Sequence, residues 1–372
     1  AHHGGCRERR GNLVRVAIAA AGTGGHVYPA LAVAEELHSR GIPKEHIVFI
    51  GGDRMEATVI PARGYPFVAV DIHGIRRSIS MDNVSLPAKV LAARSTIVEE
   101  IEERGLEAMV VFGGYVAGPA ALAASKASIP LIVHEANAVP GLANRMIARR
   151  ADTIYVAFAP SLAKLPTAEV IGSPLRGEFS AFDRDAIRLR ARARYGLPDE
   201  GPVLAVVGGS QGAAFLNDVA AELGAMADRP FSILHVTGPN HHDAISEIAS
   251  SHPGWVTVPF EESMIDVYAA CDVILCRGGA MTVSEVEATN TPAIIVPLPA
   301  GKGYQGRNAS DLVASGGGVV VDQADVASVA QAAFDLITDQ DRTERMRSAP
   351  RTVDHGRAAS VMADRIMGVA HA

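Results

Sequence analysis

The chain has 372 residues, of which 48% are apolar and 20% are charged, and its formal net charge is −7. This length exceeds one ordinary hydrophobic core, so we expect two folded, water-soluble domains. The acidic balance argues against a nucleic-acid partner, which needs a dense Lys/Arg surface. The three cysteines are too few for a disulfide framework or a paired-cysteine zinc site, and they suit a reducing cytoplasm.

Two segments resemble targeting or membrane signals only superficially. The first dozen residues carry charge without a following apolar core, so they do not resemble a secretory signal and are interpreted as a tail. The longest uncharged run, residues 108–125, approaches the length of a membrane span. Glycines and a proline interrupt it, so we expect a buried strand, a glycine loop and a helix there.

Short β-branched runs alternate with helical patterns along the first half of the chain. The expected strands lie within residues 13–20, 46–52, 67–72, 108–114, 130–136 and 153–158. The pattern restarts near Pro202, with strands expected within residues 202–207, 231–238, 255–260, 272–279, 292–299 and 316–322. This alternation is typical of parallel α/β sheets, so the predicted fold class is α/β with two doubly wound domains.

The segment between the two halves, residues 165–201, is rich in proline and charge and weak in strand character. We place a hinge near residues 172–176, which gives domains of 12–175 and 176–350. The last segment, from residue 338 onward, is predicted to be helical on both sides of Pro350. Each half opens with a strand, a glycine-rich turn and a helix, and paired domains of this kind bind ligands in the cleft at their strand ends.

The first glycine turn is Gly22-Thr23-Gly24-Gly25-His26, and we expect a helix to follow it from about Pro29. Glycines allow a ligand close to the backbone, and a helix N-terminus attracts anions. Val27 stands where a dinucleotide fingerprint needs glycine, although Asp53 after the next strand keeps a dehydrogenase interpretation open. His26 is either a general base or a residue that caps the helix or binds phosphate.

Other strand ends in the first half are also followed by glycine or polar residues. The loop at residues 113–122 contains Tyr115 and at minimum forms a tight turn into a helix. The segment 134–145 carries His134, Glu135, Asn137 and Asn144, a burst of polar groups that needs partners. Glu135 and Asn137 suit sugar hydroxyls, whereas bracing of the loop is enough to explain Asn144.

The second half repeats this arrangement at three strand ends. Ser210 and Gln211 lie in a glycine turn, and Glu285 is expected in the first turn of a helix that Thr282 or Ser284 caps. The loop 297–310 carries polar residues, namely Lys302, Tyr304, Gln305, Arg307 and Asn308. No Walker A motif occurs in the chain, and no D-x-D motif directly follows an expected strand, which disfavours metal-dependent sugar transfer.

Together and in this order, the motifs resemble the membrane-associated N-acetylglucosaminyltransferases of peptidoglycan synthesis, in glycosyltransferase family 28. The resemblance implies a GT-B fold, two Rossmann-like domains facing a cleft, with a C-terminal helix at about 351–372 packed back on the first domain. It implies transfer of GlcNAc from UDP-GlcNAc to the 4-hydroxyl of MurNAc in lipid I, with inversion, to form lipid II. No cofactor or metal is implied.

The resemblance also assigns roles by motif. His26, Glu135 and Asn137 become the catalytic candidates, and the acceptor side is lined by His26, Tyr115, His134 and Asn137. The donor-binding set is Thr23, Gly24, Gly25, Asn137, Arg176, Ser210, Gln211, Phe260, Arg277, Glu285, Gln305 and Asn308. The chain departs from the family motifs at Ala21, Ser173, Ala214, Gly278 and Gly303-Tyr304.

A lipid acceptor implies that the first domain touches an anionic membrane surface. The segment 73–94 mixes apolar and basic residues, and Arg149 and Arg150 add to it, although an amphipathic helix packed on the sheet also explains the apolar positions. We therefore expect a peripheral protein on the cytoplasmic face of the membrane, with cell-wall synthesis proteins as potential partners. A UDP-GlcNAc 2-epimerase, a non-catalytic relative and an enzyme with another donor sugar remain alternatives.

Overall fold

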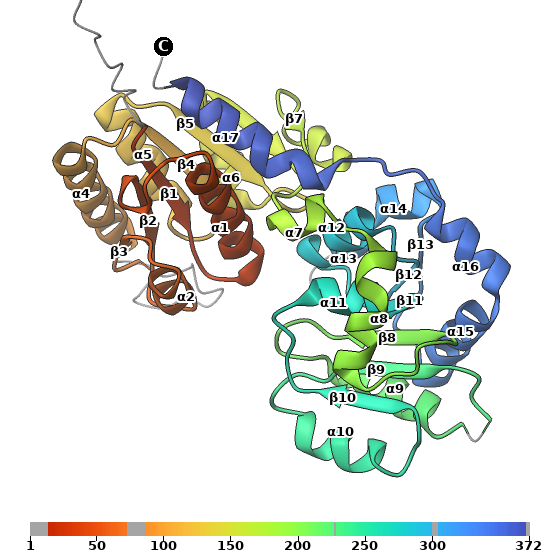
Figure 1. Ribbon diagram of the computed structural model, residues 1–372. Coiled ribbons are helices and arrows are strands. Elements are labelled where there is room, and N and C mark those ends of the chain that lie inside the picture. The colour runs from red at the N-terminus through yellow and green to blue at the C-terminus, as the bar shows by residue number, and fades with distance from the viewer. Residues whose placement is uncertain (1–13, 73–85, 227, 300–303, 370–372) are drawn as a thin grey trace, which may run out of the picture. The chain divides into compact units, whose positions relative to one another are not determined.

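The computed structural model describes residues 14–72, 86–226, 228–299 and 304–369, which form two parallel sheets flanked by helices (Figure 1). The chain divides into two compact units. Unit 1 comprises Ala1–His134, Leu142–Ile154 and Ser360–Ala372, and unit 2 comprises Glu135–Gly141 and Tyr155–Ala359. The predicted α/β class with two doubly wound parallel sheets is confirmed.

The first sheet has seven strands in the order β3-β2-β1-β4-β5-β6-β7. Their bounds are β1 Val16–Ala20, β2 Ile47–Gly51, β3 Phe67–Ala69, β4 Ala108–Gly113, β5 Leu131–Glu135, β6 Thr153–Val156 and β7 Glu169–Val170. The first six were predicted, and β7 was not. It pairs only Glu169 and Val170 with β6, and a strand of two residues has no detectable periodicity.

Helices cover both faces of this sheet. They are α1 Gly24–Ser39, α2 Glu56–Ala62, α4 Leu86–Arg104, α5 Ala117–Ala127 and α6 Leu142–Ile147, with short 3-10 turns at Lys44–His46 and Ala148–Arg150. Ala17 and Ala19 of β1 pack with α4 and α5 in one core cluster. Figure 1 shows α1 on the opposite side, as expected because successive side chains of a strand alternate between faces.

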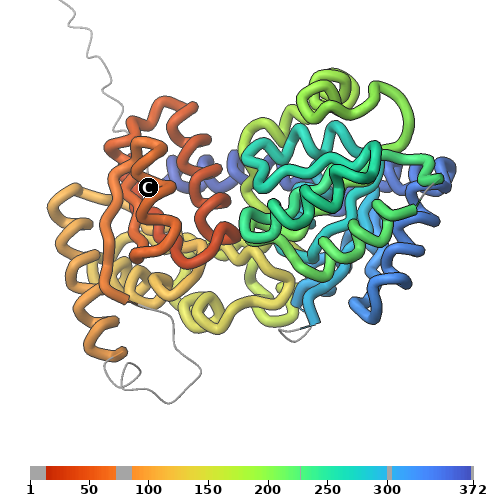
Figure 2. The backbone as a smooth tube through the Cα atoms, turned by 90° about the horizontal axis from the view of Figure 1, so that it is seen from below, coloured from red at the N-terminus to blue at the C-terminus, as the bar shows by residue number. Residues whose placement is uncertain are grey.

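The C-terminal helix α17 (Ala358–Val369) contributes its residues from Ser360 onward to unit 1. Arg40, which ends α1, forms an ion pair with Asp364, and Arg365 donates to the hydroxyl of Thr153 at 2.9 Å. Figure 2 shows the blue end of the chain against the red N-terminal elements. Polar contacts therefore hold this helix beside α1 and β6.

The second sheet has six strands, all predicted, in the order β10-β9-β8-β11-β12-β13. They are β8 Val203–Val207, β9 Ser232–Val236, β10 Trp255–Val258, β11 Val273–Cys276, β12 Ala293–Ile295 and β13 Gly318–Val320. The helices of unit 2 are α7 Gly177–Ser180, α8 Arg184–Tyr195, α9 Ala214–Gly224, α10 His242–Ala249, α11 Met264–Ala270, α12 Ala280–Thr289, α13 Tyr304–Asn308, α14 Ser310–Ser315, α15 Val326–Thr338 and α16 Gln340–Arg347, with 3-10 turns at Ala159–Ala163 and His355–Arg357.

Alternate residues of β8 divide the core of unit 2 into two layers. Val203 and Ala205 pack with α8, α11 and α12, while Leu204 and Val206 pack with α9 and α15. All of these strand residues are fully buried, and burial of one Val or Leu side chain contributes about 1.5–3 kcal/mol. Apolar burial on both faces accounts for the uninterrupted hydrophobic runs by which the strands were predicted.

In each sheet the strand order reverses beside the first strand, at β1 in unit 1 and at β8 in unit 2. Ala20 pairs with Gly113, and Val207 pairs with Cys276. The loops that follow β1 and β4 are therefore neighbours, as are the loops that follow β8 and β11. In open α/β sheets, ligands bind at such switch points.

Candidate functional site

In unit 1, the glycine turn after β1 leads into a helix that begins at Gly24, not near Pro29 as predicted. Pro29 instead lies in the second turn, where its missing N–H leaves the carbonyl of Gly25 without its helical partner. Thr23 takes the N-cap position with an extended backbone, and its side chain forms no capping bond. The first backbone N–H groups of α1 have no intrahelical acceptor and point out of the helix end.

This earlier start places His26 in the first turn of α1. Its Nδ1 lies 3.1 Å from the carbonyl oxygen of Ala21 and 3.5 Å from the hydroxyl of Thr23. Because a carbonyl can only accept, Nδ1 carries the proton, and Nε2 is the basic nitrogen of the neutral ring. His26 is partly exposed and its Nε2 faces Gly113, at the end of β4.

A buried carboxylate that the sequence analysis missed holds three loops of this edge together. Glu56 has no exposed surface. Its Oε1 accepts from the hydroxyl of Tyr115 at 2.7 Å and from the backbone N–H of Gly52 at 3.2 Å, and its Oε2 accepts from the N–H of Gly22 at 3.2 Å. We call these four residues the Glu56 knot. They follow β1, β2 and β4, so one side chain fixes the spacing of three strand ends.

The environment of Glu56 keeps it ionised. Burial opposes the charge, but the bonds from Tyr115 and from the backbone N–H groups of Glu56, Gly22 and Gly52 outweigh it and lower the pKa of the carboxyl. Burial and the neighbouring Glu56 raise the pKa of Tyr115, which remains a hydrogen-bond donor. Gly52 admits the tyrosine because a Cβ there would lie 2.2 Å from the Tyr115 oxygen.

His134 and Asn144 lie behind this edge. The side chain of Asn144 donates to the backbone carbonyl of His134 at 3.3 Å, so the bracing role predicted for Asn144 is confirmed. The ring of His134 is fully buried, 5.5 Å from the ring of Phe112 between centroids. The sheet therefore hides the ring that the prediction placed against the acceptor.

In unit 2, Glu135 organises the loop that follows β5. Its Oε1 accepts from the backbone and side-chain nitrogens of Asn137 at 2.9 and 3.2 Å, and its Oε2 accepts from the N–H of Gly141 at 3.0 Å. The carbonyl of Asn137 accepts from the hydroxyl of Ser161 at 2.9 Å. Glu135 is 3% exposed, so its carboxylate acts within the loop.

Asn308 joins this loop to the turn after β11. Its Oδ1 accepts from the N–H of Ala138 at 2.9 Å, and its Nδ2 donates to the carbonyl of Gly278 at 3.0 Å. Gly278, one of the departures from the family motifs, packs against α13, where an added Cβ would lie 2.3 Å from the carbonyl oxygen of Gln305. The close approach of α13 therefore accounts for glycine at this position.

Gln305 and Arg277 also bond to nearby loop atoms. The Oε1 of Gln305 accepts from the N–H of Leu298 at 2.9 Å. The Nη1 of Arg277 donates to the carbonyl of Val296 at 3.0 Å and to Oε1 of Gln323 at 2.7 Å. Burial lowers the pKa of Arg277. These contacts hold the loops after β11 and β12 at one edge of the sheet.

Ser210 and Gln211 are exposed in the loop after β8. The backbone of this loop packs directly on the loop after β9, where a Cβ at Gly212 would lie 2.2 Å from the carbonyl oxygen of Thr237. The loop leads to α9, whose N-cap residue Ala213 offers no capping side chain. Exposed polar side chains and helix-end N–H groups therefore lie together at this strand end.

Glu285 lies in the second turn of α12, not in the first as predicted, because the helix starts at Ala280 with Gly279 as N-cap. Neither Thr282 nor Ser284 caps it; the hydroxyl of Ser284 donates to that of Ser173 at 2.9 Å. The hydroxyl of Tyr268 donates to Oε2 of Glu285 at 2.9 Å. Burial raises the pKa of Glu285 to about 7, against opposing effects of Tyr268 and Arg176.

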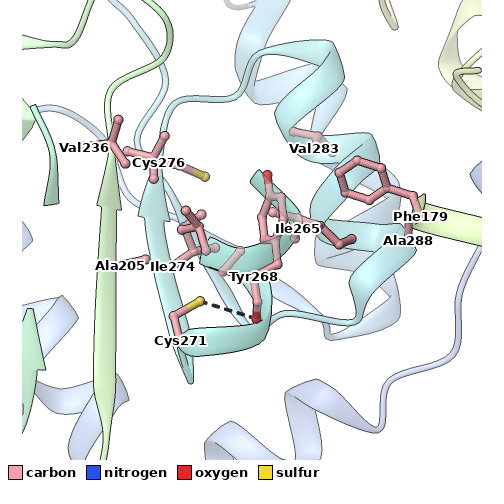
Figure 3. Packing of buried hydrophobic residues seen from close by; sticks show 14 of the residues in the cluster. Phe179, Ala205, Val236, Ile265, Tyr268, Cys271, Ile274, Cys276, Val283 and Ala288 are labelled. Atoms are coloured by element: carbon pink, nitrogen blue, oxygen red, sulfur yellow. Dashed lines mark hydrogen bonds between the residues drawn. The ribbon is translucent and has the colours of Figure 1, made fainter. Parts of the chain in front are cut away.

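Tyr268 belongs to the apolar core of unit 2. Figure 3 shows its ring beside Ile265 and Ile274, and its centroid lies 6.1 Å from that of Phe179. Arg176, at the start of α7, bonds to Glu178 at 2.9 Å and donates to the carbonyl of Glu262 at 3.1 Å. Phe260, after β10, is 44% exposed. Each predicted donor residue from Arg176 to Asn308 thus lies on unit 2, and four of them, Ser210, Gln211, Phe260 and Arg277, lie just after strand carboxyl ends.

Some predictions fall outside the described residues, namely the first dozen residues, residues 73–85 of the basic apolar segment, and Lys302 with Gly303. In the part of the chain that is described, no three His, Cys, Asp or Glu side chains are grouped to hold a metal ion. None of the helices described is long and apolar enough to cross a membrane.

Comparison with known proteins gives matches over nearly the whole chain. Residues 16–156 match the glycosyltransferase family 28 N-terminal domain, and residues 203–364 match its C-terminal domain. The UDP-N-acetylglucosamine--N-acetylmuramyl-(pentapeptide) pyrophosphoryl-undecaprenol N-acetylglucosamine transferase of Rhodococcus erythropolis is 39% identical, over 96% of this chain and 95% of that protein.

Solved structures agree with this match. The crystal structure of Acinetobacter baumannii MurG superimposes with a TM-score of 0.75 at 30% identity, covering 95% of this chain and 99% of that one. A UDP-GlcNAc 2-epimerase from Neisseria meningitidis bound to UDP-GlcNAc reaches a TM-score of 0.68 at 14% identity, covering 95% of this chain and 100% of that one. At that identity the epimerase shares the fold alone.

Proposed function

The chain belongs to glycosyltransferase family 28, and we propose that it transfers GlcNAc from UDP-GlcNAc to the 4-hydroxyl of the MurNAc unit of lipid I, forming lipid II. The observation that carries this proposal is the 39% identity, over nearly the full length of both chains, to a transferase whose name states that reaction. The epimerase alternative is not favoured, since its similarity is limited to the fold.

His26 is the proposed general base. Its Nδ1 donates to the carbonyl of Ala21, and Nε2 is the nitrogen proposed to take the proton of the acceptor 4-hydroxyl. The oxygen then attacks the anomeric carbon of GlcNAc from the side opposite the diphosphate. One carbon–oxygen bond forms as the bond to UDP breaks, so the sugar inverts and UDP leaves with the electron pair.

The donor is proposed to bind unit 2. Ser210, Gln211 and the helix-end N–H groups near them suit the diphosphate, since backbone N–H groups at a helix end stabilise developing negative charge. Glu285 suits the ribose hydroxyls and Phe260 the uracil, as the family motifs imply. Asn308 and Glu135 are proposed to act by shaping the loops, because their side chains bond to loop atoms.

Because the proposed acceptor is a lipid, we propose that the protein acts at the cytoplasmic face of the cell membrane as a peripheral protein. Within the described residues this rests on the α6 region of unit 1, where Leu142 and Met146 are 65% and 63% exposed. Arg145, Arg149 and Arg150 are exposed on the same short stretch. Exposed apolar residues bordered by arginines suit an anionic bilayer surface.

The decisive assay incubates the protein with labelled UDP-GlcNAc and a short-chain lipid I analogue, with and without EDTA. We expect a disaccharide-lipid product in both, since neither D-x-D triplet of the chain, at 183–185 and 339–341, directly follows a strand. Epimerised UDP-sugar, or no turnover, would contradict the proposal. A product formed only without EDTA would leave the transferase assignment standing and contradict its metal independence.

The His26→Ala variant tests the base. We expect kcat to fall about 10²–10⁴-fold, as for loss of a general base. His38→Ala is the matched control, because His38 lies at the other end of α1 and is exposed. An unchanged kcat in His26→Ala would make His26 a structural residue.

A further inference from the structure

Four arginines surround one aspartate at the amino-terminal ends of the unit 2 strands, opposite the carboxyl ends that carry the proposed donor loops. Asp272 immediately precedes β11, whereas Arg277 follows it. The Asp272 carboxylate contacts Arg184 at 2.7 Å, Arg188 at 3.1 Å and Arg192 at 3.0 Å. Arg347 donates to the backbone carbonyl of Asp272 at 3.0 Å, and its Nη2 lies 3.8 Å from the carboxylate.

The hydrogen bonds of Arg192 account for it as a structural residue. It is fully buried, and its donors reach the carbonyls of Ala270, Pro198, Asp199 and Gly201 as well as Asp272. Its guanidinium ties α8 to the turns on either side of the sheet edge. One carboxylate and one fully bonded guanidinium make a balanced pair.

The other three guanidinium groups are not balanced. Buried nitrogens of Arg184 (Nε), Arg188 (Nη1) and Arg347 (Nη1) have no hydrogen-bond partner. The other carboxylate paired with this group is Glu344, 3.8 Å from Arg347 and 72% exposed. A buried donor without a hydrogen bond destabilises the fold, and a charged one does so more.

The same helix shows what a balanced arrangement looks like. On α8, Arg190 and Arg194 face Asp266 and Glu261, so two cations meet two anions. The Asp272 cluster instead sets four cations against the partly buried Asp272 and the exposed Glu344. Burial and the neighbouring Arg188 lower the pKa of Arg192.

We propose that Arg184, Arg188 and Arg347 bind a small phosphate-type dianion beside Asp272. Guanidinium groups match the oxygens of such an anion in geometry and charge, and an anion also offsets the excess positive charge, which water does not. The three side chains are 17–20% exposed, so a small ion reaches their exposed surface, although not the buried nitrogens named above. The strand between this site and Arg277 spans four residues, about 13 Å, which separates it from the donor site.

The test measures binding of inorganic phosphate to the full chain by calorimetry, with chloride at equal ionic strength as reference. Arg188→Gln removes one donor of the site, and Arg190→Gln is the matched control on the same helix, 74% exposed. We expect wild type and Arg190→Gln to bind phosphate at least tenfold more tightly at this site than Arg188→Gln. Phosphate that binds at the donor loops contributes equally to the titrations of all three proteins, so it does not affect their comparison.

Thermal unfolding separates the proposal from a purely structural role. We expect phosphate to raise Tm of wild type and Arg190→Gln more than Tm of Arg188→Gln, and Arg188→Gln to be at least as stable as wild type in chloride. Equal phosphate binding by all three proteins overturns the proposal. An Arg188→Gln that is less stable by the same amount in both buffers also overturns it; if that variant fails to fold, Arg347→Gln takes its place.

Discussion

Replacement of Glu56 by glutamine tests whether the Glu56 knot fixes the loops of unit 1. Glutamine has nearly the same shape, but it offers one acceptor oxygen where the carboxylate offers two. Bonds to Tyr115 and Gly52 can persist without the charge, while the amide NH2 group faces the N–H of Gly22. The substitution therefore changes hydrogen bonding and charge without creating a cavity.

The expected loss follows from the three bonds. Charge-assisted bonds contribute about 1.5–3 kcal/mol each and neutral ones about 0.5–1.5, and a buried unsatisfied donor costs about 1–3. We therefore expect Glu56→Gln to lower the free energy of unfolding by about 3 kcal/mol, or Tm by about 6–12 °C. The control Glu100→Gln, from a partly exposed i,i+4 pair with Arg104, should change it by less than about 1 kcal/mol.

The direction of the Glu56 pKa shift determines how this loss of stability changes with pH. The pKa of Glu56 is lowered below its ordinary 4.5, so its stabilisation is complete above that value and disappears as the pH falls through the folded pKa. The gap between wild type and Glu56→Gln should therefore close below pH 4.5. Denaturant melts between pH 3 and 8 measure it, together with Tyr115→Phe and the double variant. A stability difference that does not change with pH would refute the stabilising role of the Glu56 knot. Losses of Glu56→Gln and Tyr115→Phe that add exactly in the double variant would refute it as well.

Three further substitutions test unit 2. Gly278→Ser restores the residue of the family motif, but its Cβ would lie 2.3 Å from the Gln305 carbonyl, so denaturant melts should show a loss of about 1–3 kcal/mol. Glu285→Gln should gain stability over wild type as the pH rises from 4.5 to about 7, because the folded pKa is raised to about 7; melts at pH 4 and 8 measure this, and the KM for UDP-GlcNAc should rise. Glu135→Gln should lower Tm, because the carboxylate accepts three loop N–H bonds.

The sheets could be predicted from sequence because both faces of each strand are buried. Such strands appear as continuous apolar runs, and the glycine and polar loops at their ends mark the ligand edge. The two-residue β7 lacks that signal. The start of α1 was misplaced for a different reason, because proline at the first helical position is the usual pattern and here Pro29 lies in the second turn.

Glu56 was missed because a glutamate at the first position of a helix is already favoured by the helix dipole. Its distinguishing signal is positional: it lies five residues after the end of β2 and meets Gly22 and Tyr115, which are far away in sequence. Only the sheet order, which places β1 between β2 and β4, brings the three together. Contacts of this kind depend on topology, and local pattern does not contain them.

The polar residues at the strand ends form two groups: buried residues that bond to the backbone of neighbouring loops, and exposed residues. Glu56, Glu135 and Asn308 are buried and bond to backbone groups of neighbouring loops, so they set the shape of the edge. Ser210 and Gln211 are exposed. Proton transfer to Glu135 would break bonds that hold its loop, whereas Nδ1 of His26 is fixed by the Ala21 carbonyl, so we propose His26 rather than Glu135 as the base.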